Sequence, residues 1–202
     1  GPTTAEQRHP GFKVEYFGHA CQWNGPSWPF STSVTLTALA NLLNGKSQNY
    51  INKSDYFKLI RNYALSHRIT YTSGAKICWI DENQNPYTGE WLSRNMRQRW
   101  GEIPVERGKD YNHSTFCDLI INGLIGLRPQ VGNNLIINPL ITEDQWDWFC
   151  LDGVPYHGRS VSVIWDKNGD HYNRGKGLAI MVDGHTVGSS TKLQKTEINN
   201  EF

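Results

Sequence analysis

The feature that most constrains this fold is a change of apolar periodicity near Arg128-Pro129. Before it, apolar side chains recur at the spacing of amphipathic helices. The expected helices run from Ser31 or Ser33 to Asn44, from Ser54 to His67 and from Ser114 to Leu127. After it, short β-branched and aromatic runs predict antiparallel strands, with turn signals at Asp152-Gly153, Asn168-Gly169 and Asp183-Gly184. Helices followed by strands, without alternation, predict two regions of different class.

The composition narrows the class of ligand. Twenty basic and nineteen acidic residues nearly balance, which gives no electrostatic case for nucleic acid or an anionic membrane. No apolar run is long enough to span a bilayer. Charged residues make up only 19% of the chain, and the chain contains eight tryptophans. Such a composition is typical of a surface that binds something neutral and polar, such as carbohydrate, although core packing explains any single tryptophan equally well.

The cysteines give no metal or disulfide framework. Cys21, Cys78, Cys117 and Cys150 are widely spaced and form no C-x-x-C pair, so we expect buried free thiols and no metal or cofactor. A zinc site would need His19 and Cys21 to meet His113 and Cys117. Hydrogen-bonded histidines and buried thiols explain the same residues.

A tryptophan-rich segment at 21–30 is the first candidate for ligand binding. Trp23 and Trp28 flank Asn24 and Gly25, and two prolines stiffen the backbone. They can present an aromatic platform with amide donors, which orients a sugar without carrying out chemistry. The alternative is a helix-entry loop packed into the core.

The loop 79–89 carries the main catalytic candidate. Asn-Pro and Thr-Gly dipeptides predict an ordered turn, which places Glu82 between the aromatic residues Trp79 and Tyr87. Rings stack on aromatics while amides bind hydroxyls, so this composition suits a sugar pocket. Glycosidic hydrolysis needs two carboxyl groups, and Glu82 fills only one role. Asp81 is expected to point elsewhere. The alternative is a surface turn with an exposed acid.

A third segment, 106–114, mixes charges densely before a helix start. Arg107 and His113 are candidates for contacts with substrate hydroxyl or carboxylate groups, and Glu106 and Asp110 are possible acidic neighbours of Glu82. A solvated charged loop that caps a helix explains the same residues.

Two of these segments resemble one family. Trp23-Asn24-Gly25-Pro26-Ser27-Trp28 is similar to the W-x-G-P-x-W segment of (α/α)6-barrel glycoside hydrolases, the family 63 and mannosylglycerate-hydrolase-like glucosidases. Glu82-Asn83-Gln84-Asn85-Pro86-Tyr87-Thr88-Gly89 resembles their E-N/Y-x-N-P-x-T-G loop. Asn112-His113-Ser114-Thr115-Phe116 lies where they carry an F-S-W-T-like helix start, but lacks the tryptophan.

The resemblance implies a mainly α fold with appended β structure: partial (α/α)6 toroid helices, then a small antiparallel β-sandwich-like module. It implies that Glu82 is the general base of an inverting mechanism. It also places the general acid, an Asp, upstream of the tryptophan segment, where this chain offers none. We therefore expect residues 1–129 to be the C-terminal part of a catalytic domain, 130–190 a β module and 191–202 a polar tail.

The expected function is that of the C-terminal part of a glycosidase. It would act on an oligo- or polysaccharide, with Trp23, Asn24, Gly25, Trp28, Trp79, Tyr87, Arg107 and His113 binding substrate. The expected partners are the carbohydrate and the missing N-terminal part of the enzyme or a partner chain. The family favours a periplasmic or secreted location. The alternatives are a non-catalytic carbohydrate-binding module and a structural subunit that completes a partner glycosidase.

Overall fold

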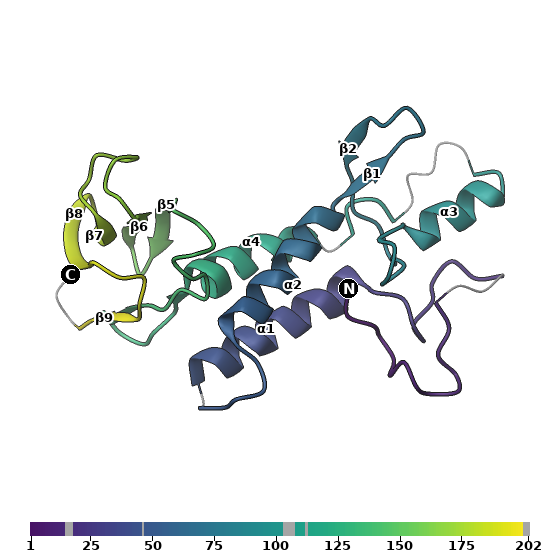
Figure 1. Cartoon of the computed structure of the whole chain (residues 1–202), viewed down its shortest axis with the longest axis horizontal. Coiled ribbons are helices and arrows are strands. Elements are labelled where there is room, and N and C mark those ends of the chain that lie inside the picture. The colour runs from purple at the N-terminus through teal and green to yellow at the C-terminus, as the bar shows by residue number, and fades with distance from the viewer. Residues whose placement is uncertain (15–17, 46, 103–107, 112, 200–202) are drawn as a thin grey trace. The chain divides into compact units, whose positions relative to one another are not determined.

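The computed structural model describes residues 1–14, 18–45, 47–102, 108–111 and 113–199. The chain, drawn in Figure 1, divides into two compact units. The first unit comprises Gly1–Leu39 and Lys58–Phe116, and the second comprises Ala40–Phe57 and Cys117–Phe202. In the part of the chain that is described, every helix is too short or too polar to cross a bilayer.

Two regular helices confirm the sequence prediction. Helix α1 spans Pro29–Gly45, and its proline occupies the first position, where the missing N–H costs no hydrogen bond. Helix α2 spans Lys53–Ser66. Its cap is Asn52 rather than the expected Ser54: the Asn52 side chain accepts from the Asp55 N–H at 3.1 Å, and the Asp55 carboxylate accepts from the Asn52 N–H at 2.9 Å. This reciprocal arrangement satisfies two donors that the helix start leaves free.

Three short elements of the first unit were not predicted. Strands β1 (Arg68–Thr70) and β2 (Lys76–Cys78) form an antiparallel hairpin, and helix α3 spans Leu92–Arg99. They surround a small apolar cluster of Trp79, Ile80 and Trp91, against which Ile69 packs. Each element is too short to show a clear period in the sequence, so tertiary packing rather than local pattern decides it.

The segment expected to form one helix at 114–127 is helical as far as Ile125, but it is not one regular α-helix. A 3₁₀ turn at His113–Thr115, one α turn at Phe116–Asp118 (α4) and a π-helix at Leu119–Ile125 (η2) follow one another. Gly126 ends the series at φ 82°, a left-handed conformation in which a Cβ would come within 2.1 Å of the Asn138 carbonyl oxygen.

The strands of the second unit form two antiparallel sheets. The larger sheet has the order β5 (Trp148–Tyr156), β6 (Arg159–Asp166), β7 (Gly177–Val182) and β8 (His185–Ser190). The smaller has the order β3 (Leu127–Arg128), β4 (Leu135–Ile137) and β9 (Thr196–Ile198). Strand β9 lies in the predicted polar tail. The Asp183-Gly184 turn is confirmed, whereas Asp152-Gly153 lies at a bulge within β5.

The predicted mainly α fold is wrong. Within the described ranges there are four α-helices, two of them short, and nine strands in three antiparallel sheets. The described helices therefore do not bear out a partial (α/α)6 toroid followed by one small β-sandwich-like module. The prediction overweighted helices because amphipathic periodicity marks them clearly. Pairings such as Leu135–Ile137 with Thr196–Ile198 join segments far apart in sequence, and no local pattern reveals them.

Candidate functional site

The loop that carries Glu82 is ordered, as predicted. Ser27 and Gln84 exchange two backbone hydrogen bonds at 2.9 and 2.8 Å, which pins the loop to the tryptophan-rich segment. The Asn85 side-chain oxygen accepts from the N–H groups of Tyr87 and Thr88, at 2.9 and 3.2 Å. This Asx-type turn is what Asn-Pro sequences favour. The two segments that resemble one family are thus joined through their backbones.

The Glu82 carboxylate is held by two side chains. Its Oε2 atom accepts from Arg97 Nη2 at 3.2 Å, an ion pair in which the Arg97 side chain is almost entirely buried. The same oxygen accepts from the Cys21 thiol at 3.2 Å. A buried guanidinium loses little further entropy when it orients a carboxylate, so the Glu82 side chain has a defined direction.

Asp81 belongs to the same cluster and is fully buried. Its Oδ1 atom accepts from the Glu82 N–H at 2.7 Å and from the Ser93 hydroxyl at 3.1 Å, and its Oδ2 atom accepts from the Trp79 indole at 3.4 Å. Burial raises the pKa of Asp81, against the opposing effect of these hydrogen bonds and of the Arg97 charge. Asp81 therefore holds the backbone at Glu82 in place through the hydrogen bond that it accepts from the Glu82 N–H.

The Gly108 backbone lies so close to this cluster that a residue with a side chain would not fit there. Its φ is +89°, and a Cβ there would lie 2.3 Å from Asp81 Oδ1 and 2.9 Å from Arg97 Nη1. Asp110 follows, and its N–H donates to the Ile80 carbonyl at 2.8 Å. The segment 108–110 thus runs beside the catalytic candidate.

Trp23 and Trp28, expected from the sequence to present an aromatic platform, stack on each other. Their ring centroids are 3.9 Å apart at an interplanar angle of 15°. Trp28 is only 2% exposed, and its indole donates to the Gln22 carbonyl at 2.7 Å, whereas Trp23 is 49% exposed. Trp28 is therefore a buried support, while Trp23 carries the open surface, and the contact of either ring with a sugar stays a prediction.

Tyr111 relates this aromatic pair to Glu82. Its ring meets Trp28 edge-on at 5.7 Å between centroids. Burial raises the pKa of Tyr111, and the charges of Glu82 and Cys21 raise it further. The carboxylate and the tryptophan pair therefore occupy one neighbourhood of the first unit.

Asn24 and Gly25 contact the N-terminal segment that contains Gly11 and Lys13. Asn24 Nδ2 donates to the Gly11 carbonyl at 2.9 Å, and the Asn24 carbonyl accepts from the Lys13 N–H at 3.0 Å. A Cβ at Gly25 would lie 2.0 Å from the Lys13 carbonyl oxygen. These contacts give both residues a structural task, and their predicted contact with substrate stays a prediction.

The two aromatic residues expected to flank Glu82 lie in different surroundings. Trp79 is buried in the apolar cluster, with the Arg94 guanidinium 5.2 Å and the Lys109 ammonium 5.3 Å from its ring centroid. Tyr87 is exposed at the tip of the loop. Arg107 lies outside the described residues, and for His113 only the backbone, within the 3₁₀ turn, is described.

Sequence reasoning missed several members of this site. From the sequence, Arg97, Cys21 and Tyr111 had no expected role beside Glu82, and Asp81, expected to point elsewhere, bonds to the Glu82 backbone. The cysteines are free, as expected, but Cys78, Cys117 and Cys150 are exposed rather than buried. The three arginines shortly before Trp100 (Arg94, Arg97 and Arg99) could have indicated this partner, because arginine binds carboxylates in a defined geometry.

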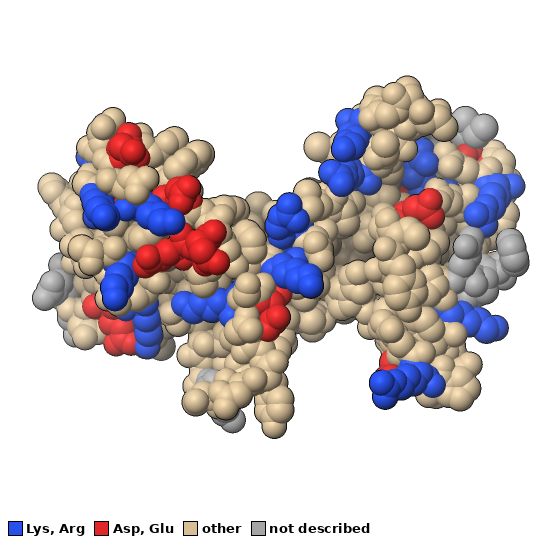
Figure 2. Space-filling view, in the orientation of Figure 1, with Lys and Arg blue, Asp and Glu red and all other residues tan. Residues whose placement is uncertain are grey.

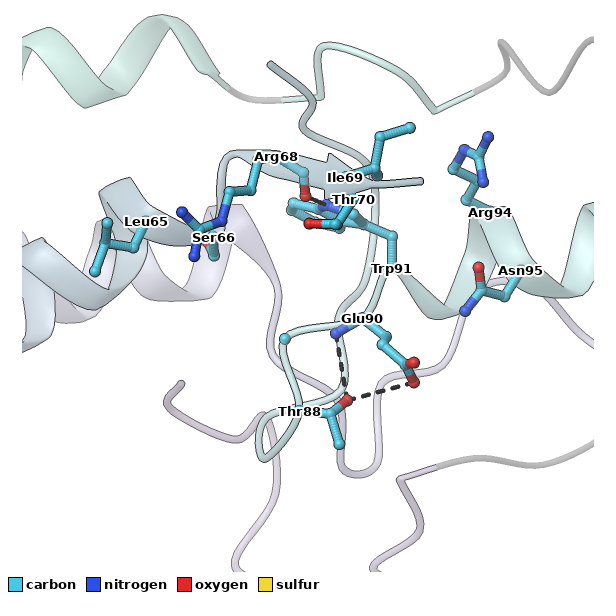
Figure 3. Close-up of a pocket in the computed structure, with 11 residues that line it drawn as sticks. Leu65, Ser66, Arg68, Ile69, Thr70, Thr88, Glu90, Trp91, Arg94 and Asn95 are labelled. Atoms are coloured by element: carbon cyan, nitrogen blue, oxygen red, sulfur yellow. Dashed lines mark hydrogen bonds between the residues drawn. The ribbon is translucent and has the colours of Figure 1, made fainter. Parts of the chain in front are cut away.

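A separate hollow of about 380 Å³ lies beside the end of the loop (Figure 3). Thr88 and Glu90 close its lower side, where the Glu90 N–H donates to the Thr88 hydroxyl at 3.3 Å and that hydroxyl donates to the Glu90 carboxylate at 3.4 Å. Arg68 and Trp91 line it further up. Glu82 is not among its described lining residues, so this hollow and the carboxylate cluster are distinct.

Comparison with known proteins agrees with these motifs. Residues 1–114 match the family model described as "Mannosylglycerate hydrolase MGH1-like glycoside hydrolase domain". Residues 127–188 match "Glycosyl hydrolase family 65, C-terminal domain". A solved structure described as a sialidase is 44% identical and has a TM-score of 0.86 over 100% of this chain, which spans 17% of that structure's length. The chain therefore belongs to the MGH1-like glycoside hydrolases.

Proposed function

We propose that this chain supplies the base half of a glycosidase active site, with Glu82 as the general base of an inverting hydrolysis. The observation that carries the proposal is the Glu82 carboxylate, held by the buried Arg97 at 3.2 Å in the neighbourhood of the half-exposed Trp23. In this reaction the base removes a proton from water as the water attacks the anomeric carbon. Trp23 would hold the sugar ring by stacking on its C–H face.

The arrangement gives each neighbour of Glu82 a task. Arg97 orients the carboxylate, so that Oε1, the oxygen not engaged in the ion pair, is the atom that would accept the proton. Asp81 and Gly108 set the backbone and the close packing around it. Preorganisation of this kind matters because a general base must lie within hydrogen-bond reach of the water that it activates.

The general acid is proposed to lie outside these residues. Asp81 has no exposed surface, so it cannot reach the leaving oxygen of a sugar. Asp110 is the alternative within the described part of the chain, since its backbone lies beside Ile80. A further part of the enzyme fits the observation that the chain spans 17% of the matching solved structure. The same proposal keeps residues 1–129 as the catalytic part and 130–190 as an appended β module.

The direct test measures hydrolysis by the protein as the cell makes it. Glu82→Gln keeps the size of the side chain and removes the base, so kcat/KM for a cleaved oligosaccharide should fall about 10²- to 10⁴-fold. Circular dichroism should show that the variant stays folded, although loss of the ion pair with the buried Arg97 lowers its melting temperature. Glu6→Gln, at an exposed position in the same unit, is the matched control and should keep full activity. Normal turnover in Glu82→Gln would refute the assignment.

Two further measurements separate the parts of the proposal. Proton NMR of the first-formed sugar should show the anomer opposite to that of the substrate, and retention would exclude the inverting mechanism. Asp110→Asn tests the internal acid: a loss as large as that of Glu82→Gln would place the acid within this chain. Sugar binding that depends on Trp23, without hydrolysis in the wild type, would favour the non-catalytic binding module instead.

A further inference from the structure

We infer that the second unit carries a separate carbohydrate-binding site at the start of strand β5, built around Trp146 and Trp148. A hollow of about 610 Å³ opens there, within the range of ordinary small-ligand sites. Its described lining consists of Gln145, Trp146, Asp147, Trp148, Phe149, Cys150 and Tyr172. The inference does not depend on Glu82 or on the first unit.

The sheet geometry explains why tryptophan surface is left open. Successive residues of a strand point to opposite faces, and along β5 Trp148 and Cys150 are exposed while Phe149 between them is buried. Phe149 and Trp146 meet at 6.5 Å between centroids, which places Trp146 beside the edge of the core. Trp148 remains 50% exposed. Trp146 and Trp148 line the same hollow, and contiguous exposed apolar surface of this kind marks binding sites.

The Trp148 ring is fixed before any ligand arrives. His171 stacks on it at 3.8 Å between centroids and 7° between planes, and Tyr172 meets it edge-on at 6.1 Å. One face of the indole is therefore covered by His171, so its open surface is presented in a defined direction. A ring already immobilised loses little entropy when a ligand stacks on it.

The loop that supplies His171 and Tyr172 is itself anchored. The buried carboxylate of Asp166 accepts from the N–H groups of Gly169, His171 and Tyr172, at 2.8, 2.9 and 2.9 Å. These bonds, that from Tyr172 first, lower the pKa of Asp166. Charge-assisted bonds to three backbone donors make this a rigid support rather than a surface loop that happens to touch Trp148.

The polar groups around the hollow suit a neutral polyol. Asp147, which lines the hollow, pairs with Lys167 at 3.1 Å, so the charge at this rim is matched. Figure 2 shows acidic and basic side chains intermingled on the drawn face of the second unit as a whole. Without a field of one sign, a polyanion has no electrostatic attraction. Indole faces with carboxylate and amide groups at the rim match the C–H face and hydroxyls of a pyranose. The occupant is therefore a neutral pyranose oligosaccharide.

The test uses titration calorimetry with maltohexaose, cellohexaose and mannohexaose on the protein as the cell makes it. Trp23→Ala serves as the background, so that binding near Glu82 is weakened. We expect at least one oligosaccharide to bind in this background, and adding Trp148→Ala should weaken it at least about tenfold. Trp148→Phe should restore part of the affinity, since a smaller ring still stacks.

The control is Trp100→Ala. Trp100 is 52% exposed and follows helix α3 in the first unit, so it matches Trp148 in type and exposure. It should leave the affinity unchanged, and circular dichroism should show that all variants stay folded. If none of the three oligosaccharides binds in the Trp23→Ala background, or if Trp148→Ala binds as tightly as its parent, the inference is overturned. Loss of hydrolysis in Glu82→Gln with retained binding here would show that the two sites are independent.

Discussion

At the scale of single residues, the site depends on one cluster of opposed charges. Arg97 forms an ion pair with the Glu82 carboxylate, and its charge favours the ionised form of Asp81. Asp81 in turn accepts a hydrogen bond from the Glu82 backbone N–H. Two carboxylates share one buried guanidinium, and only one of them keeps some exposure to solvent. This asymmetry assigns different tasks to adjacent acids: Asp81 holds the loop, and Glu82 is available for chemistry.

The raised pKa of Asp81 predicts a pH effect on stability. The folded protein binds a proton at Asp81 more tightly than the unfolded chain, whose ordinary value is 3.8. Its contribution to stability is therefore greatest below that value and falls as the pH rises through the folded pKa. Asp81→Asn removes this term, so the free energy of unfolding of the variant, relative to wild type, should increase as the pH rises above 3.8.

Urea unfolding at several pH values measures this difference. Any constant cost of changing the hydrogen bonds shifts all points equally and leaves the slope intact. Asp170→Asn, which removes an exposed carboxylate in the second unit, is the control for loss of one negative charge. A difference between Asp81→Asn and wild type that stays flat or falls with pH would show that Asp81 is not held as described.

At the scale of elements, the π-helix at Leu119–Ile125 shows how one contact interrupts a helix. The Tyr56 hydroxyl, from the first half of α2, donates to the Leu119 carbonyl at 3.0 Å. Its oxygen would lie 1.9 Å from a Cβ at Gly123, so the ring fits only against glycine. Burial raises the pKa of Tyr56 well above its usual range. The wider turns of the π-helix thus accompany a phenol inserted against its backbone.

This packing predicts a coupling between Gly123 and Tyr56. Gly123→Ala should destabilise the protein by about 1–3 kcal/mol, because the new methyl overlaps the phenol oxygen. Tyr56→Phe removes that oxygen and one hydrogen bond, at about 0.5–1.5 kcal/mol. In urea unfolding the double variant should be less destabilised than the sum of the single variants. Strict additivity would mean that the two residues do not share the space described.

At the scale of the whole molecule, residues far apart in sequence complete each unit. In the first unit, Ser27 pairs with Gln84; in the second, Leu135 pairs with Ile198. The latter pairing adds β9 to a sheet begun by β3 and β4. The C-terminal segment expected to be a polar tail therefore contributes a buried side chain, Ile198.

Ile198 should accordingly matter for stability. Ile198→Ala should lower the free energy of unfolding by about 2–5 kcal/mol, as for other buried aliphatic truncations. Lys195→Ala, at an exposed position in the same segment, should change it by less than about 0.5 kcal/mol. Thermal or urea unfolding followed by circular dichroism measures both. Equal effects from the two variants would indicate that β9 does not pack as described.

The sequence by itself determined the features that depend on residues close together along the chain, namely regular helices, strands and turns. Helix periodicity located α1 and α2, β-branched and aromatic runs predicted antiparallel strands after Arg128-Pro129, and turn residues predicted the ordered loop of Glu82. The two motifs indicated the glycoside hydrolase family, which the comparisons show. These features are local, because backbone propensity and the spacing of apolar side chains act over a few residues.

Only the tertiary structure decided the rest. It set the balance of helix and sheet, the break at the π-helix, the pairing of β4 with β9 and the partners of Glu82. Arg97 lies fifteen positions from Glu82, and Cys21 lies sixty-one positions away. No local pattern encodes such contacts, because they depend on burial and on the closure of long loops, which the whole chain settles together.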